Sequence, residues 1–190
     1  FDGVESDLKE NIKFNSNKEL IIYSYRVAGT VGLIMAKILK VSSKNSLKAA
    51  IDLGIAMQLT NIARDVIEDS KRNRSYINSN FESIIKTLKL ADSFYESSFK
   101  SIKEIPLSSR FGILVARRVY REIGNKILNK KSMENYKNSG KIYVSNFGKI
   151  NQTLLSIFDL IKLVFTKQGE HLRIDEHRII NEQINLNERI

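Results

Sequence analysis

The 190-residue sequence lacks cysteine and tryptophan and contains a single proline, Pro106. Without cysteine, the chain cannot form disulfide bonds, thiolate metal sites or cysteine nucleophiles. Because proline interrupts helices, its scarcity leaves long stretches free to be helical. Long hydrophobic runs are also lacking. The most apolar stretch, residues 26–39, contains Arg26, Lys37 and two glycines, so it is not an obvious membrane span.

Acidic residues are fewer than basic ones. The sequence contains 21 Asp and Glu and 31 Lys and Arg, so its formal net charge is +10. This excess suggests an anionic partner, for which nucleic acid, a membrane surface and phosphate groups are the candidates. Hydrophobic residues make up 42% of the chain, which is ordinary for a globular protein and too many for a disordered one. The length suits a single domain with one core.

The hydrophobic pattern predicts helices, and no stretch alternates convincingly with the period of two that strands require. We therefore predict an all-α domain. Asn17 is the expected N-cap of the first helix, Ser108 or Ser109 that of the fourth, and Asn146 that of the last. The expected helices cover residues 18–40, 47–71, 81–104, 109–130 and 146–165. Residues 1–16 and 135–145 are expected to be irregular. Residues 166–190 are expected to form a polar tail or a marginal helix.

The most informative segment is the second predicted helix, in which five polar residues recur along one face. At about 100° per residue they fall within roughly 80° of one another, and the same line continues backwards through apolar Leu47, Ile51 and Gly54. The other faces are apolar, so we expect protein to surround this helix and its buried polar groups to need partners. The polar stripe consists of Gln58, Asn61, Asp65, Asp69 and Arg72.

Spacing alone leaves two interpretations of the acidic pair open. Asp65 and Asp69 either belong to a solvated face or bind a cation between them, since like charges at this spacing destabilise an exposed helix by roughly 0.2–0.5 kcal/mol. Mg²⁺ typically binds one or two carboxylates together with substrate phosphates. Arginines suit phosphate oxygens, although compensation of the helix dipole alone would explain Arg72 and Arg74. Carboxylates, arginines and an adjoining apolar stripe together predict a site for a phosphorylated hydrophobic molecule.

The first predicted helix contains Gly29 and Gly32. Each glycine costs a helix about 1 kcal/mol relative to alanine, so both need an explanation. Close packing against another helix or against a ligand would supply it, and we favour helix–helix contact.

Several segments resemble the squalene/phytoene synthase family. YSYRVAGTVGLIM (23–35) resembles the tyrosine-containing helix of that family, and QLTNIARDVIEDSKRNRSY (58–76) resembles its second aspartate-rich motif. The similarity continues in LGIAMQLTNIARDV (53–66) and SRFGILVARRVYREI (109–123) and covers most of residues 1–165. Arg26, directly before Val-Ala-Gly, is typical of the phytoene synthase branch, because squalene synthases usually carry tyrosine there.

The resemblance implies an all-α helical bundle of the isoprenoid synthase type. Such enzymes join two prenyl diphosphates head to head with Mg²⁺ or Mn²⁺. In the phytoene branch, two geranylgeranyl diphosphates give a cyclopropyl diphosphate and then phytoene, and no nicotinamide cofactor is expected. Metal ions neutralise the leaving diphosphate, and water must be excluded because it would quench the carbocation.

The resemblance also implies roles for individual residues. Asp65, Asp69 and Asn61 would bind the metal, with Glu68 in a lesser role. Tyr25 would act in catalysis together with the two aspartates. The residues that would bind the prenyl diphosphate substrate or border its reacting carbons and isoprenoid tunnel are Arg26, Val27, Ala28, Gly29, Gln58, Asn61, Arg64 and Arg72.

The sequence departs from the family in three places. Nothing upstream of Tyr23 offers the Asp-x-x-x-Asp of the first aspartate-rich motif, Ile77-Asn78 replaces the usual Leu-Pro, and residues 166–190 match nothing in the family. We therefore expect residues 1–165 to be a partial synthase domain, incomplete at the N-terminus, and residues 166–190 to be a polar C-terminal tail. We also expect that this chain alone does not form product.

Other functions remain as alternatives. The nearest is a squalene-type or hopanoid-pathway condensation of farnesyl diphosphate. The retained aspartates count against a non-catalytic relative that acts as an assembly factor, and the scattered basic residues count against binding of nucleic acid. His171 and His177 are expected to be exposed to solvent rather than bound to metal. We expect a cytoplasmic protein whose surface lysines also favour peripheral association with an anionic membrane.

Overall fold

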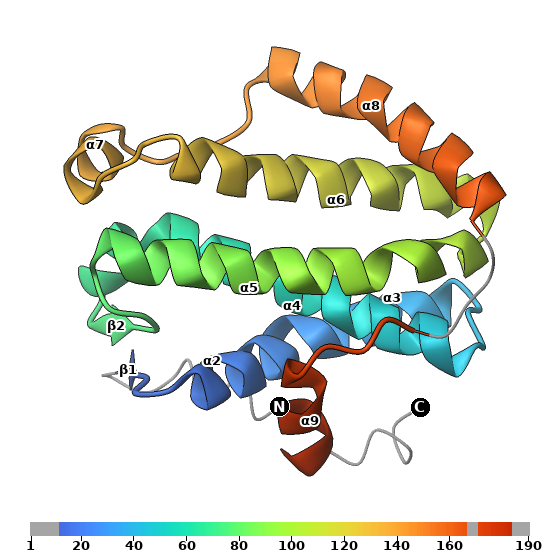
Figure 1. The fold of residues 1–190 in the computed structure, drawn as a ribbon, viewed down its shortest axis with the longest axis horizontal. Coiled ribbons are helices and arrows are strands. Elements are labelled where there is room, and N and C mark those ends of the chain that lie inside the picture. Colours follow the sequence, from blue (N-terminus) through green and yellow to red (C-terminus); the bar gives the residue numbers. More distant parts are fainter. Residues whose placement is uncertain (1–11, 167–170, 184–190) are drawn as a thin grey trace.

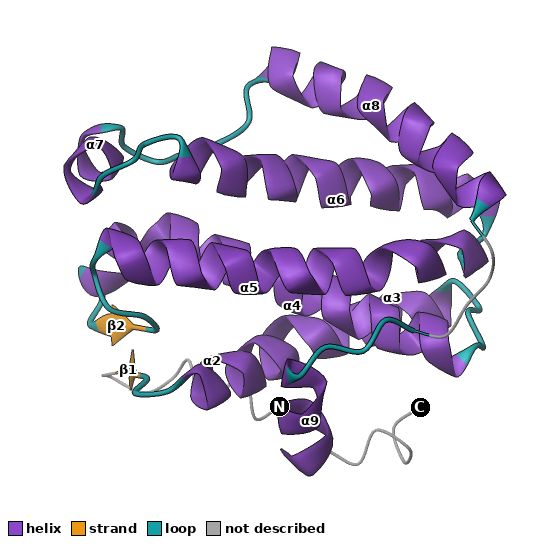
Figure 2. Cartoon of the chain, viewed as in Figure 1, coloured by secondary structure: helices purple, strands orange, loops and turns teal. Residues whose placement is uncertain are grey.

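The computed structural model describes residues 12–166 and 171–183. Within these residues the chain is almost entirely helical, which confirms the all-α prediction (Figures 1 and 2). The elements in chain order are β1 (Ile12–Lys13), α2 (Asn17–Ser24), a π-helix (Tyr25–Gly29), α3 (Thr30–Ile38), α4 (Lys44–Ser70), β2 (Arg74–Ser75), α5 (Phe81–Phe99), a 3₁₀ helix (Lys100–Glu104), α6 (Leu107–Leu128), α7 (Met133–Asn138), α8 (Asn146–Phe165) and α9 (Glu176–Gln183).

The long helix α4 is the centre of the bundle. It packs against α5, α6, α3 and the π-helix, while α8 packs on the outer side of α6. Figure 1 shows the resulting layers, with α6 and α8 on one side of α5 and with α2 and α3 on the other. The second predicted helix, which carries the polar stripe, is therefore surrounded by protein as expected.

Helix starts differ from the predicted caps by one to three residues. Ser16, not Asn17, caps α2, because its Oγ accepts a hydrogen bond from the backbone N–H of Glu19 while the Glu19 carboxylate accepts one from the N–H of Ser16. Pro106 precedes α6 in place of Ser108 or Ser109. Ser145 caps α8 in place of Asn146, with its Oγ 3.2 Å from the N–H of Gly148.

Two segments expected to be irregular contain ordered elements. Residues 135–145 were expected to form a loop, but α7 extends into them, and its Tyr136 hydroxyl donates a hydrogen bond to the carbonyl of Ala63 at 3.2 Å. At the other end, Ile12–Lys13 pairs in parallel with Arg74–Ser75. Both elements depend on partners more than 60 residues away in the sequence, which local patterns do not reveal.

The π-helix and α3 both approach α4 closely at glycines. A Cβ atom on Gly32 would lie 2.1 Å from the carbonyl oxygen of Ala50, and one on Gly54 would lie 2.2 Å from that of Ala28. No side chain fits at either position without moving backbone. Gly29 is likewise buried against α4. The predicted helix–helix contact is therefore confirmed.

Apolar side chains also lie on the outside of two helical segments. The segment Asn17–Ile38 has the length and composition to cross a membrane, and 39% of its most apolar window is buried inside the protein. Its exposed apolar residues lie on α3, and a second set lies along α8. They are Val31, Ile34, Met35 and Ile38 on α3, and Phe147, Ile150, Leu154, Ile157, Phe158, Ile161, Val164 and Phe165 on α8.

Candidate active site

A largely apolar cavity of about 390 Å³ lies between the π-helix, α3, α4, the 3₁₀ helix and α6. Its α4 wall begins near Ser46 and ends at the amide side chains of Gln58 and Asn61. The cavity therefore has apolar walls and a polar end that coincides with the start of the polar stripe. Its walls include Val27, Ala28, Val31, Leu53, Met57, Ile102, Ile113 and Tyr120.

The Asn61 side chain at this polar end is not satisfied by the protein. Its Oδ1 atom is buried and has no hydrogen-bond partner among the residues that the structure describes. A buried acceptor without a donor costs about 1–3 kcal/mol. Such an atom is suited to a cation, an ordered water molecule or a ligand that donates a hydrogen bond.

Asp65, one turn further along α4, is held by its neighbour. Arg64 donates two hydrogen bonds to its carboxylate, from Nε to Oδ1 at 2.8 Å and from Nη2 to Oδ2 at 2.6 Å. Both side chains are only 18% exposed. Lys141 lies 3.7 Å from Asp65 Oδ1 and forms a shorter ion pair with Glu68 at 2.9 Å. In this arrangement the charge of Asp65 is already compensated.

The surroundings of Asp69, in contrast to those of Asp65, oppose the ionisation of its carboxyl group. Burial, followed by the negative charge of Asp65, raises the pKa of Asp69 to about 6, although Arg74 and Arg72 act in the other direction. A carboxyl group that ionises with difficulty beside a second carboxylate is stabilised by a nearby cation. This environment favours the cation-binding interpretation of the acidic pair over the solvated face.

The donor set fits a hard divalent cation. Asn61, Asp65 and Asp69 follow each other at intervals of four residues on one side of α4, and all three offer oxygen atoms, which Mg²⁺ prefers. The buried, unpartnered Oδ1 of Asn61 is the observation that supports this fit most directly.

Comparison with known proteins shows similarity to one family over much of the chain. A family model described as squalene/phytoene synthase matches residues 1–81. The 15-cis-phytoene synthase of Enterobacter agglomerans is 33% identical over 147 residues, which cover 66% of this chain and 50% of that protein. Phytoene synthase 2 of Solanum lycopersicum is 32% identical over 177 residues, covering 78% of this chain and 56% of that protein. A crystal structure of a dehydrosqualene synthase in complex with ligand is 27% identical, with a TM-score of 0.65, and covers 83% of this chain and 61% of that one.

The chain is similar to the squalene/phytoene synthase family in both sequence and fold. The resemblance drawn from the sequence motifs is thereby confirmed, and so is the isoprenoid synthase type of helical fold. The chain spans about half the length of the curated relatives that it matches. These relatives are prenyltransferases, and several of them are bacterial phytoene synthases.

The structure brings together only some of the site residues that the family resemblance implies. Val27 and Ala28 line the cavity with Gln58 and Asn61, and Gly29 is buried against α4. Tyr25 is 1% exposed and lies in the core, outside the set of cavity-lining residues. The side chains of Arg26 and Arg72 are exposed to solvent.

Some residues of this synthase-type site were missed by sequence reasoning. Tyr120 of α6 and Ile102 of the 3₁₀ helix line the cavity opposite α4. The segment that contains Tyr120 carried a family resemblance, but no pattern in it distinguished a cavity-facing tyrosine from a core one. The apolar continuation of the stripe was also misplaced, since Leu47 and Ile51 lie in the core while Gly54 lines the cavity.

Proposed function

We propose that this chain takes part in the head-to-head condensation of two prenyl diphosphates, with geranylgeranyl diphosphate as substrate and phytoene as product through a cyclopropyl diphosphate. The observation that carries the proposal is the continuity of one surface of α4, from the oxygen donors Asp69, Asp65 and Asn61 into the apolar cavity. A diphosphate headgroup and an isoprenoid tail need such neighbouring environments. The phytoene synthases among the relatives support the choice of substrate and product.

Asp65, Asp69 and Asn61 would hold Mg²⁺ or Mn²⁺. The bound ion supplies neutralisation of the charge that develops on the leaving diphosphate.

Arg64 has a defined part in this arrangement. Its guanidinium donates a hydrogen bond to each oxygen of Asp65. When diphosphate binds, Arg64 exchanges this carboxylate for phosphate oxygens, to which its planar fork is equally suited. The exchange frees Asp65 as a ligand without leaving either charge unpaired in a half-buried place.

The apolar walls of the cavity would hold the isoprenoid tail, which would itself displace water from them. Val27 and Ala28 on one side and Leu53 and Met57 on the other offer no hydroxyl, amide or charged group to a carbocation. Exclusion of water matters because a water molecule next to an allylic cation would give an alcohol in place of the hydrocarbon.

Binding of thiodiphosphate analogues, which do not ionise readily, tests the proposal without requiring turnover. Isothermal titration of the chain with geranylgeranyl thiodiphosphate is expected to show binding that depends on Mg²⁺. Asp65→Ala and Asp69→Ala should each remove the Mg²⁺ dependence, while Glu82→Ala, an exposed acid paired with Lys86, should not. Equal binding by all four proteins would show that the polar stripe is structural. Tighter binding of the farnesyl analogue would support the squalene or hopanoid alternative.

A further inference from the structure

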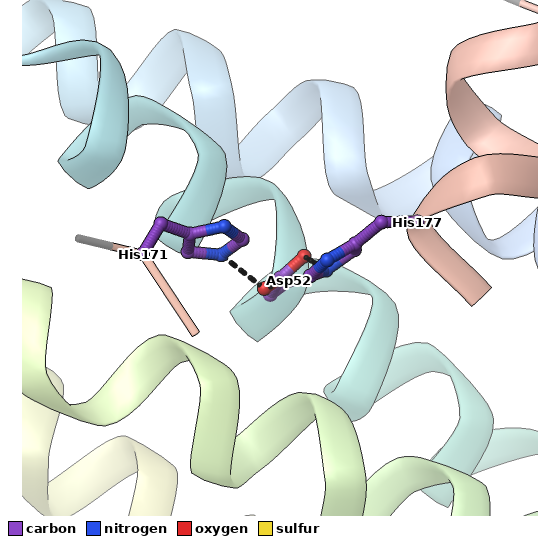
Figure 3. A group of neighbouring side chains, drawn as sticks. All are labelled: Asp52, His171 and His177. Atoms are coloured by element: carbon purple, nitrogen blue, oxygen red, sulfur yellow. Dashed lines mark hydrogen bonds and ion pairs between the residues drawn. The ribbon is translucent and has the colours of Figure 1, made fainter. Parts of the chain in front are cut away.

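The buried carboxylate of Asp52 lies on the side of α4 that faces away from the cavity, roughly 150° around the helix from Ala50 and Met57. It is 2% exposed and accepts a hydrogen bond from Ser97 Oγ at 2.5 Å. It also accepts hydrogen bonds from His171 Nε2 at 2.6 Å and His177 Nε2 at 2.9 Å (Figure 3). The expectation that both histidines are exposed is therefore wrong, since the side chains of His171 and His177 are 7% and 15% exposed.

The hydrogen bonds define the proton position on His177. Its Nδ1 accepts the backbone N–H of Ile174 at 3.2 Å, so the ring proton is on Nε2, where it is donated to Asp52. Burial raises the pKa of Asp52, but the hydrogen bonds from His171 and His177 more than offset this effect and hold it below its ordinary value. The cluster is thus a buried anion compensated by donors from α5 and from the C-terminal segment.

The same three side chains have the ligand types of a transition-metal site, and their ligand atoms lie within 4.8 Å of one another. A metal on His177 Nε2 would move the ring proton to Nδ1, where the N–H of Ile174 already points. Two donors would then face each other. The hydrogen bonds on both sides of the His177 ring therefore favour a hydrogen-bonded cluster over a metal site.

The cluster attaches the C-terminal segment, residues 171–183, to the bundle. Ile180 of α9 is 2% exposed and belongs to the same core as Ile51 and Ile55 of α4. The ring of His177 packs edge-on against Phe94, with centroids 5.9 Å apart. Helix α9 also packs against α2 (Figure 1), and α2 continues into the π-helix that carries Val27 and Ala28.

We propose that Asp52, His171 and His177 form a latch that closes the C-terminal segment over α2 and α4 and thereby positions the Val27–Ala28 wall of the cavity. The three are positioning residues, because none of them lines the cavity. The proposal rests on the proposed function for its ligand. Its test is separate, because it concerns the coupling of α9 to the cavity wall and not the dependence of binding on Mg²⁺.

The test compares donor-deleting and donor-keeping variants. His177→Leu and His171→Leu remove one donor each and leave a buried carboxylate short of a hydrogen bond, whereas His177→Gln keeps an N–H at a similar reach. Hydrogen exchange of the leucine variants should be faster by about tenfold or more in both α9 and residues 20–29. Their affinity for geranylgeranyl thiodiphosphate should fall severalfold with its Mg²⁺ dependence intact. His177→Gln should restore most of both, and Arg173→Leu, an exposed change on the same segment, should alter neither.

Three results would overturn the latch. One is faster exchange confined to α9 with unchanged exchange in residues 20–29 and unchanged analogue affinity, since the cluster would then only anchor the tail. The second is protection of the wild-type chain by Zn²⁺ that is lost in Asp52→Asn, which would identify a metal site. The third result applies if the leucine variants do not fold, and it comes from hydrogen exchange of the wild-type chain measured at increasing urea concentrations. The proposal requires α9 and residues 20–29 to open together, and separate opening contradicts it.

Discussion

At the scale of single residues, two oxygen-bearing groups give the polar stripe a chemical character that its spacing does not reveal. Asn61 Oδ1 is buried without a partner, and Asp69 is half-buried beside Asp65 with a raised pKa. Both groups cost the protein free energy, and a cation at the stripe would relieve both. Asp65 differs from them because Arg64 already compensates its charge. The stripe is therefore less stable without a ligand than an equally long stripe of satisfied residues.

Asp69→Asn is expected to stabilise the ligand-free chain at neutral pH. The carboxyl group ionises near its ordinary 3.8 when the chain is unfolded and near 6 when it is folded. Between these values the folded state binds more protons, so the free energy of unfolding falls as pH rises from about 4 to 6. Since the side chain is only half-buried, solvent screening should limit the gain at pH 7 to about 1 kcal/mol. Urea unfolding from pH 3 to 8 should show the two proteins diverging between about pH 4 and 6 and converging below about pH 4.

The matched control is Asp92→Asn, which removes an acid that pairs with Arg121 at 2.6 Å and should not stabilise the chain at any pH. Added Mg²⁺ should raise the free energy of unfolding of the wild-type chain and leave that of Asp69→Asn unchanged. A lower free energy of unfolding for Asp69→Asn than for the wild-type chain at pH 7 would contradict the raised pKa of Asp69.

At the scale of elements, the close contact between α3 and α4 shapes the cavity. Gly32 brings α3 to backbone distance from α4, and Gly54 does the same for the π-helix, so the wall that carries Val27 and Ala28 lies directly against the α4 wall. The sequence predicted this contact from the cost of glycine within a helix. It did not predict helix α7, whose six residues are held by a hydrogen bond from Tyr136 to a carbonyl 73 residues earlier in the chain.

Gly32→Ala and Gly112→Ala form a matched pair that tests the helix contact. The new Cβ at position 32 would overlap the carbonyl oxygen of Ala50, and relief requires the backbones to separate, so we expect a loss of about 3 kcal/mol. The Cβ at position 112 of α6 meets nothing within 4 Å, and the change should stabilise the chain by about 0.5–1 kcal/mol. Urea unfolding measures both. Similar midpoints for the two variants would show that α3 and α4 are not in backbone contact.

At the scale of the whole molecule, α4 serves two functions on opposite sides. One side carries the polar stripe, which we propose binds the metal, and the cavity wall, and the other carries Asp52, which holds the C-terminal segment. The segment expected to be a polar tail is in its described part packed against the bundle, with Ile180 in the core. We therefore expect a substitution in the Asp52 cluster to alter the Val27–Ala28 wall of the cavity on the opposite side of α4.

The chain alone is expected to bind prenyl diphosphate without forming hydrocarbon. Its acidic pair Asp65 and Asp69 would supply one side of the proposed metal site, and nothing in the given sequence upstream of Tyr23 offers the Asp-x-x-x-Asp of the first aspartate-rich motif. Incubation with geranylgeranyl diphosphate and Mg²⁺, followed by extraction and chromatography, should yield no phytoene, while titration with the thiodiphosphate analogue shows binding. Detection of phytoene from the purified chain would refute this expectation.

What the sequence by itself determined is local or periodic in origin. A single proline and a helical repeat of apolar residues predicted the long helices, and the spacing of Asn61, Asp65 and Asp69 placed three oxygen donors on one side of α4. These features need only the geometry of one helix. The family motifs added the identity of the fold and the expected place of the site.

Only the tertiary structure decided how distant segments meet. It placed Tyr120 on the cavity wall, buried Tyr25 in the core, and left Arg26 exposed although it stands within the same motif. It also joined Asp52 to His171 across 119 residues of sequence. Such contacts are made by side chains from different helices, whose relative rotation depends on the packing of the whole core. No periodicity within one helix contains that information.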